Sequence, residues 1–192
     1  MSVHQAIRVT IEAAWIAFLA YWFIMAFRVK RTVKRQGLGG RVRHLLLGAV
    51  AFMLLFDDRI PWGPLATRFI PAVWTWAFLG AALTWAGVGL AIWARTILGG
   101  NWSALVTVKQ NHTLIRSGPY SVVRHPIYSG LLLAGLGTAL AVGEVRGLLA
   151  VALALFVWLD KSRTEERFMI EQFGREYEEY RQHTRALVPF IL

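Results

Sequence analysis

Apolar residues gather in five runs along the chain, separated by short polar segments. The runs lie at about 9–27, 45–56, 69–93, 127–143 and 147–159. A transmembrane helix needs roughly 20 apolar residues, within a range of about 17–25. The first and third runs are long enough, the fourth is at the lower limit, and the second and fifth must borrow flanking residues or sit in a helical hairpin. The pattern predicts an all-α integral membrane protein with about five transmembrane helices.

The composition agrees with a membrane protein. Of the 192 residues, 56% are hydrophobic and only 17% are charged, whereas soluble domains carry about 25% charged residues. The chain has no cysteine, which excludes disulfides, thiolate metal sites, cysteine nucleophiles and iron–sulfur clusters. No small-residue cleavage site follows the N-terminal residues, so the first run is expected to be a span rather than a removed signal peptide.

The net charge of +10 invites a nucleic-acid interpretation, but the positions of the basic residues argue against it. With all five runs as spans, 17 of the 21 Lys and Arg residues fall on one side, and Arg8, Arg59, Arg68 and Arg146 fall on the other. Cytoplasmic loops are rich in Lys and Arg because basic segments resist translocation. The basicity therefore places the N-terminus outside and the C-terminus in the cytosol. The basic segment 28–44 is expected to be part of this signal, with attraction of anionic lipid as the alternative.

About thirty polar residues separate the third and fourth runs. A connection of this length in a compact protein is usually functional or disordered, and its aromatic and β-branched content argues against disorder. Residues 99–101 and 117–119 are rich in turn formers, and 104–115 looks extended. We therefore expect an ordered cytosolic loop with a function.

A cluster of polar and aromatic residues closes this loop. Its members are Arg116, Tyr120, Arg124, His125 and Tyr128. Pro126 is well tolerated in a first helical turn, so His125 is expected at the start of the fourth helix. Backbone amides at a helix start favour a negative ligand group, the arginines add positive charge, and the tyrosines can stack on or hydrogen-bond a flat ring.

The C-terminal region predicts a helix that breaks or bends near Gly174. Lys161 and Glu165 are four residues apart and hence on one helix face, close to where the fifth run ends. Glu165 can accept a hydrogen bond from an amine or a hydroxyl group, and Lys161 or Arg163 can meet a carboxylate. A surface salt bridge is the alternative for these three residues.

Two stretches carry a family resemblance: HTLIRSGPYSVVRHPIYSG and, about forty residues later, EERFMIEQFGREYEEYRQHTRALVPFI. They resemble the isoprenylcysteine carboxyl methyltransferase family and the related phospholipid methyltransferases. The resemblance covers about 101–191, nearly half of the chain, and the N-terminal half is similar only in hydropathy. It implies S-adenosylmethionine as cofactor, which the residues by themselves do not require. No G-x-G-x-x-G motif follows a strand, so a soluble Rossmann-type site is not expected.

The resemblance also implies the residues of a site. The donor site would comprise His112, Thr113, Leu114, Ile115, Tyr120, His125, Pro126, Ile127, Tyr128 and Glu165. On the acceptor side the family commonly has an arginine where this chain has Lys161. The lysine is a point charge, whereas an arginine guanidinium can bind both oxygens of a carboxylate. Arg163, two residues further on, is an alternative residue for this role. Glu165, Lys161 and Arg163 are the residues expected to take part in the chemistry, and no metal is implied.

The implied function is methyl transfer to a lipophilic acceptor that enters from the bilayer, with carboxyl O-methylation of an isoprenylcysteine-like substrate favoured. The alternatives are N-methylation of a phospholipid amine, S-methylation of a small thiol, an NADPH-dependent membrane reductase and a non-catalytic membrane protein. Membrane lipids are expected as partners. Nucleic acid and an obligate protein partner are not expected.

The expected organisation is one membrane domain over 1–192. Residues 1–93 would form an N-terminal three-helix part and 94–192 the catalytic part, where the cytosolic loop and the C-terminal helix form the cofactor pocket. The compact chain with short loops suggests a prokaryotic inner membrane, with the active site in the cytosol.

Overall fold

The computed structural model describes residues 2–27, 32–35, 38–57, 59, 62–102, 107–109 and 113–189. Within these ranges lie the helices and strands α1 (Val3–Ala26), β1 (Thr32–Arg35), α2 (Leu38–Phe56), α3 (Trp74–Leu98), β2 (Thr107–Lys109), α4 (Pro126–Val142), α5 (Val145–Phe173) and α6 (Arg175–His183). Each of the five long helices contains most of one predicted apolar run, so the predicted all-α membrane architecture is confirmed.

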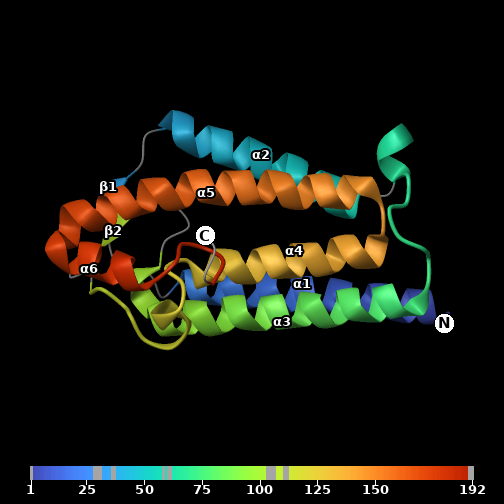
Figure 1. Ribbon diagram of the computed structural model, residues 1–192, viewed down its shortest axis with the longest axis horizontal. Helices are drawn as coiled ribbons and strands as arrows, with labels where there is room; N and C mark the ends of the chain where they lie inside the picture. The colour runs from blue at the N-terminus through green and yellow to red at the C-terminus, as the bar shows by residue number, and fades with distance from the viewer. Residues whose placement is uncertain are drawn as a thin grey trace.

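The five long helices lie side by side along the long axis of the molecule (Figure 1). In this view α2 lies against α5, and α1, α3 and α4 form a second group. The N-terminus lies at one end, and β1, β2 and α6 lie at the other. Residues Gln5–Ala26 and Trp74–Leu98 are long and apolar enough to cross a membrane, and Val42–Phe56 and Pro126–Val142 are shorter apolar helices. α5 continues far beyond its apolar run, and this extension carries charged residues toward the end with α6.

Glycines bring α3 and α4 into direct backbone contact. A Cβ on Gly87 would lie 2.4 Å from the backbone of both Gly130 and Ala134, and one on Gly137 would lie 2.5 Å from the backbone of Gly80. Small residues allow this close approach between membrane helices, where van der Waals contact drives association. The packing fixes the start of α4, which carries His125, relative to the end of α3.

Arg95 ties the ends of α1 and α3 together. Its buried guanidinium donates hydrogen bonds to the carbonyl oxygens of Met25 (3.0 Å) and Gly99 (2.6 Å), and it lies 4.5 Å from the ring centroid of Trp102. The last carbonyl groups of a helix have no partner within the helix, and a cation is favoured there by the helix dipole. Arg95 therefore caps both helices at the end of the molecule that holds the cluster around His125.

A short antiparallel ladder joins two loops at the same end. β1 pairs with β2, with Thr32 opposite Lys109 and Arg35 opposite Thr107. β2 lies within the segment 104–115 that was predicted to be extended, whereas β1 lies in the basic segment 28–44, where no strand was predicted. Residues 32–35 of the basic segment are thus paired with residues 107–109 of the loop that precedes the cluster.

The chain returns to the start of α4 after α6. Gly174, at φ 54°, ends α5 where a break was predicted. The amides of Arg124 and His125 then donate to the carbonyl oxygens of Arg185 (2.8 Å) and Ala186 (3.0 Å). The C-terminal segment therefore lies beside the residues just before α4 and pairs with them in a short parallel β-bridge.

Candidate active site

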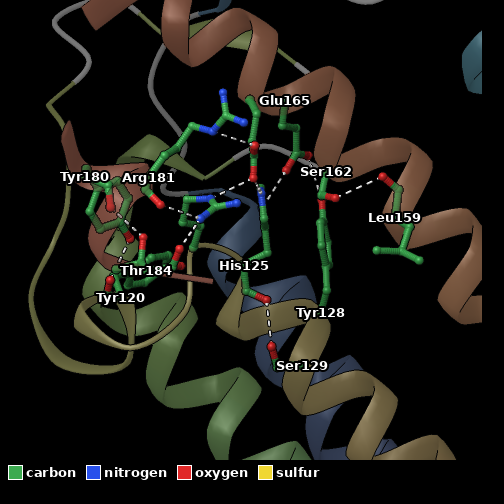
Figure 2. A network of polar contacts seen from close by, with 12 residues as sticks. Tyr120, His125, Tyr128, Ser129, Leu159, Ser162, Glu165, Tyr180, Arg181 and Thr184 are labelled. Carbon is green, nitrogen blue, oxygen red and sulfur yellow. Dashed lines mark hydrogen bonds and ion pairs between the residues drawn. The ribbon is translucent and has the colours of Figure 1, made fainter. Parts of the chain in front are cut away.

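His125 lies between two consecutive carboxylates of α5. Its Nδ1 is 3.4 Å from Oε2 of Glu165 and its Nε2 is 3.3 Å from Oε1 of Glu166, and Figure 2 shows the ring pointing from the start of α4 toward α5. Burial opposes the charged form of the imidazole, but the hydrogen bonds to Glu165 and Glu166 outweigh burial and raise the pKa of His125. The imidazole thus bridges α4 and α5.

Of the two carboxylates, Glu166 is the one that holds neighbouring elements together. Besides facing His125, it accepts a hydrogen bond of 2.8 Å from Nε of Arg124 and lies 3.3 Å from Nε of Arg181 on α6. Burial opposes ionisation, yet the contacts with His125 and Arg124 lower the pKa of Glu166 to about 2. Sequence reasoning missed this residue, because only the fold brings Arg124, His125 and Arg181 to one glutamate.

Glu165 is the more open of the two carboxylates, with 22% of its side chain exposed. It accepts a 2.6 Å hydrogen bond from the phenol of Tyr128, and Nζ of Lys161 is 4.0 Å from its Oε1. Burial opposes ionisation, but the hydrogen bond from His125 and the charge of Lys161 lower the pKa of Glu165. An ionised, partly accessible carboxylate can accept hydrogen bonds from a ligand.

Aromatic rings lie beside this carboxylate. The ring of Tyr128 is parallel to those of His125 and Trp158, with centroids 5.5 Å and 5.9 Å apart. Nζ of Lys161 lies 5.3 Å from the centroid of the Tyr128 ring, a cation–π distance. The fold thus brings Lys161, Tyr128 and Glu165 together. Trp158, three residues before Lys161 on α5, lies beside Tyr128.

Other predicted donor-site residues form the wall behind the cluster. Tyr120 and Ile127 are buried in one hydrophobic group against which Ile115 packs, and Pro126 is fully buried. The backbone carbonyl of Tyr120 accepts a 2.6 Å hydrogen bond from the phenol of Tyr180, which ties the wall to α6. These side chains shape the site through packing rather than through polar groups aimed at a ligand.

Of the remaining predicted residues, three are exposed or half-buried, and one falls outside the described ranges. Thr113 is exposed and Leu114 is half-buried, and His112 falls outside the residues that the structure describes. Arg163 is exposed and lies about 200° around α5 from Lys161. The structure therefore does not bring Arg163 together with Lys161 and Glu165.

The expectation that backbone amides at the start of α4 face a ligand is wrong for four of them. The amides of Arg124 and His125 bond to the C-terminal segment, and those of Tyr128 and Ser129 bond to the carbonyl of His125 at 3.0 Å and 3.1 Å. The predicted cation Arg116 instead pairs with Glu176 at 2.5 Å, and Arg124 pairs with Glu166. The positive groups of the loop hold α5 and α6 in place.

An apolar cavity of about 440 Å³ lies next to the cluster. It is bounded by α1, α2, α4 and α5, and its lining includes Trp15, Phe52, Leu131 and Trp158, with Lys161 at the α5 wall. Its volume falls within the range of small-molecule sites, about 300–1,000 Å³. Lys161 therefore lines the cavity and also lies beside Glu165 and Tyr128, so it connects the cavity with the cluster.

Fold and site together define a class of protein. It is a membrane-embedded helical protein with a histidine–carboxylate cluster at one end and an apolar cavity beside that cluster. The phospholipid methyltransferase family model matches residues 75–176, so the chain belongs to this family and is a membrane methyltransferase. Such an enzyme requires a methyl donor.

Two curated proteins are similar to the chain, and one of them is named for a methyl transfer. The chain is 29% identical to the protein-S-isoprenylcysteine O-methyltransferase of Schizosaccharomyces pombe over 189 residues, 94% of this chain and 73% of that protein. It is 40% identical to the cobalt-zinc-cadmium resistance protein CzcN of Cupriavidus metallidurans over 110 residues, 56% of this chain and 48% of that protein.

The fold is also similar to a solved one. The structure of a eukaryotic intramembrane Ras methyltransferase, isoprenylcysteine carboxyl methyltransferase, superposes with a TM-score of 0.53 at 23% identity, over 78% of this chain and 53% of that chain. The chain thus spans about half the length of CzcN and of this solved protein.

Proposed function

We propose that the protein transfers a methyl group from S-adenosylmethionine to the carboxylate of an isoprenylcysteine-like acceptor. The observation that carries this proposal is the double position of Lys161, on the wall of the apolar cavity and 4.0 Å from Oε1 of Glu165. A lipophilic acceptor in the cavity would then meet the donor at this lysine. The yeast relative, named for this reaction, supports the same acceptor.

The residues around Glu165 suit S-adenosylmethionine by their chemistry. The ionised Glu165 can accept hydrogen bonds from an ammonium group or from ribose hydroxyl groups, and the parallel rings of Tyr128 and Trp158 offer flat faces for adenine. When bound, the cofactor supplies an electrophilic methyl group on a sulfonium sulfur. Tyr128 holds one oxygen of Glu165 by a hydrogen bond, and the imidazole of His125 lies 3.4 Å from the other oxygen.

On the acceptor side, the cavity takes the apolar tail and Lys161 attracts the carboxylate. A carboxylate is ionised at neutral pH, so no general base would be needed: as one of its oxygens formed the O–CH₃ bond, the S–CH₃ bond would break and the donor would leave as the neutral thioether S-adenosylhomocysteine. The chain's contribution is then chiefly to hold the reacting groups in line, and positioning of this kind can lower a barrier by about 7–11 kcal/mol.

The same proposal extends to organisation and topology. Residues 94–192 would carry the catalytic part and 1–93 the supporting membrane part, within one domain. The excess of Lys and Arg at the end that holds α6 supports a cytosolic active site and an outside N-terminus, in a prokaryotic inner membrane.

Calorimetric titration of the detergent-purified chain with S-adenosylmethionine, S-adenosylhomocysteine and NADPH tests the cofactor. We expect saturable binding of the first two, and binding of NADPH alone would contradict the proposal. Incubation with methyl-labelled donor and a farnesylcysteine carboxylate then tests the reaction. An ester releases labelled methanol in base, whereas N-methyl or S-methyl products do not, so base-stable label on an amine or thiol acceptor would reject carboxyl methylation.

A further inference from the structure

The lining of the apolar cavity contains a second ionisable side chain besides Lys161. Among the described residues that line it, His44 of α2 and Lys161 of α5 are the two with titratable groups, and the others are aliphatic, aromatic or glycine. Isolated polar groups in an apolar wall fix the orientation of a ligand and give specificity. His44 lies in the part of the chain whose sequence shows no motif, so sequence reasoning had not singled it out.

The His44 ring is held in place by a carboxylate. Its Nε2 lies 2.7 Å from Oδ2 of Asp160, and only 11% of the side chain is exposed. Asp160 immediately precedes Lys161 on α5, so the residue that orients His44 is the sequence neighbour of the lysine in the same wall. Because the Asp160 carboxylate accepts from Nε2–H, Nδ1 can donate a hydrogen bond to a bound group when the ring carries both protons, as the imidazolium.

The arrangement of α2 explains why this contact matters. α2 packs mainly against α5, and one end of it is fixed by Arg146, which donates to the carbonyl oxygens of Leu54 and Asp57 at 3.0 Å each. At the other end, Arg43 and His44 bond to Asp160. The cavity lies along α2 between these two attachments, so His44 and Lys161 mark one end of it.

A lysine by itself defines the position of a carboxylate poorly. Its ammonium group is a compact point charge and does not engage both oxygens in a fixed plane as a guanidinium does. A second donor from a different helix would fix the orientation of the carboxylate relative to the methyl group. His44 lines the cavity, and its imidazolium form has a second N–H besides the one bonded to Asp160 that can supply this donor.

We propose that His44 is an acceptor-binding residue, which hydrogen-bonds the acceptor's carboxylate together with Lys161 and selects anionic acceptors over neutral ones. This inference rests on the proposed function. Asp160 is then a positioning residue that acts through His44. The apolar tail lies along α2 and α5, and the charged head lies between His44 and Lys161, next to Glu165.

The test compares His44→Phe, His44→Gln and Arg43→Gln. Arg43 is the matched control, because it contacts the same Asp160 but has a side chain that is 55% exposed and does not line the cavity. The acceptors are a farnesylcysteine carboxylate as substrate and the corresponding carboxamide as competitive inhibitor. Donor affinity is measured separately by calorimetry.

We expect His44→Phe to raise the KM for the carboxylate about tenfold or more, as for loss of a hydrogen bond to a charged group. The inhibition constant of the carboxamide and the donor affinity should stay near those of the wild type. His44→Gln, which keeps a donor, should recover part of the loss, and Arg43→Gln should behave as the wild type.

Two results would overturn the inference while leaving the proposed function intact: an unchanged KM in both His44 variants, or an equal loss of carboxylate and carboxamide affinity. The second would mean that His44 only supports the cavity wall. A wild-type protein that forms no ester from the carboxylate would instead overturn the proposed function itself, and the inference with it.

Discussion

Tyr128 donates a 2.6 Å hydrogen bond to Oε1 of Glu165, so the first turn of α4 is joined to the polar half of α5 at the centre of the site. Oε2 of the same carboxylate faces His125 at 3.4 Å. Glu165 is thus held from two sides in one orientation while part of its side chain stays exposed. A carboxylate fixed in this way would need little rearrangement to accept hydrogen bonds from a ligand.

Glu165→Gln should weaken the binding of S-adenosylmethionine by about 10- to 100-fold, because a hydrogen bond to a charged group is worth about 1.5–3 kcal/mol. The protein should still fold and be extractable, since Glu166 keeps its contacts with His125 and Arg124. Calorimetry measures the donor affinity, with the exposed Glu178→Gln as matched control. Unchanged donor affinity in Glu165→Gln would reject the assigned role.

Lys161→Ala should act on the acceptor instead. Loss of the charge at the cavity wall should raise the acceptor KM about tenfold or more, with a donor affinity within about twofold of the wild type, whereas Lys161→Arg should retain acceptor use. Steady-state kinetics with the farnesylcysteine carboxylate and donor calorimetry together provide the test. A parallel loss of donor binding in Lys161→Ala would place this lysine on the donor side.

The pair formed by Glu166 and His125 predicts stability that depends on pH in two opposite directions. The pKa of Glu166 is lowered from its ordinary 4.5 to about 2, so its contribution is present above pH 4.5 and is lost as the pH falls toward about 2. The pKa of His125 is raised above 6.5, so its contribution is present below pH 6.5 and is lost as the pH rises through the raised value.

Melting midpoints of the detergent-purified protein across this pH range test both limbs. The contribution of Glu166 at neutral pH is up to about 3 kcal/mol, and Glu166→Gln should therefore have a shallower acid limb, with the remaining slope due to groups such as Glu165. An acid limb as steep in Glu166→Gln as in the wild type would show that Glu166 does not carry this stability.

Hydropathy was sufficient to predict the five long helices, because a membrane helix must hide its backbone and show lipid an apolar surface. The start of α4 at Pro126 and the end of α5 near Gly174 were also predictable, since these residues act through local backbone geometry. β1 was not, because Thr32–Arg35 becomes a strand only when β2 lies beside it.

The site could be predicted only in part, for the same reason. The family resemblance drew attention to Tyr128, Lys161 and Glu165, which the fold brings together. Glu166 and His44 could not be predicted, because their contacts come from distant parts of the chain. Arg124 is more than forty residues from Glu166, and Asp160 is more than a hundred residues from His44. That the amides of Arg124 and His125 are already hydrogen-bonded could not be predicted either, because their acceptors lie in the C-terminal segment.

Gly87→Ala should destabilise the protein and disturb the site from a distance. A Cβ there would lie 2.4 Å from the backbone of α4, at Gly130 and Ala134, so the helices must separate, at a cost of about 1–3 kcal/mol. Gly89→Ala is the matched control two residues along α3, because its Cβ would meet nothing within 4 Å. We expect a melting midpoint several degrees lower in Gly87→Ala than in Gly89→Ala, with weaker donor binding as the start of α4 shifts. Equal midpoints and equal donor affinities would show that direct backbone contact between α3 and α4 neither stabilises the fold nor positions His125.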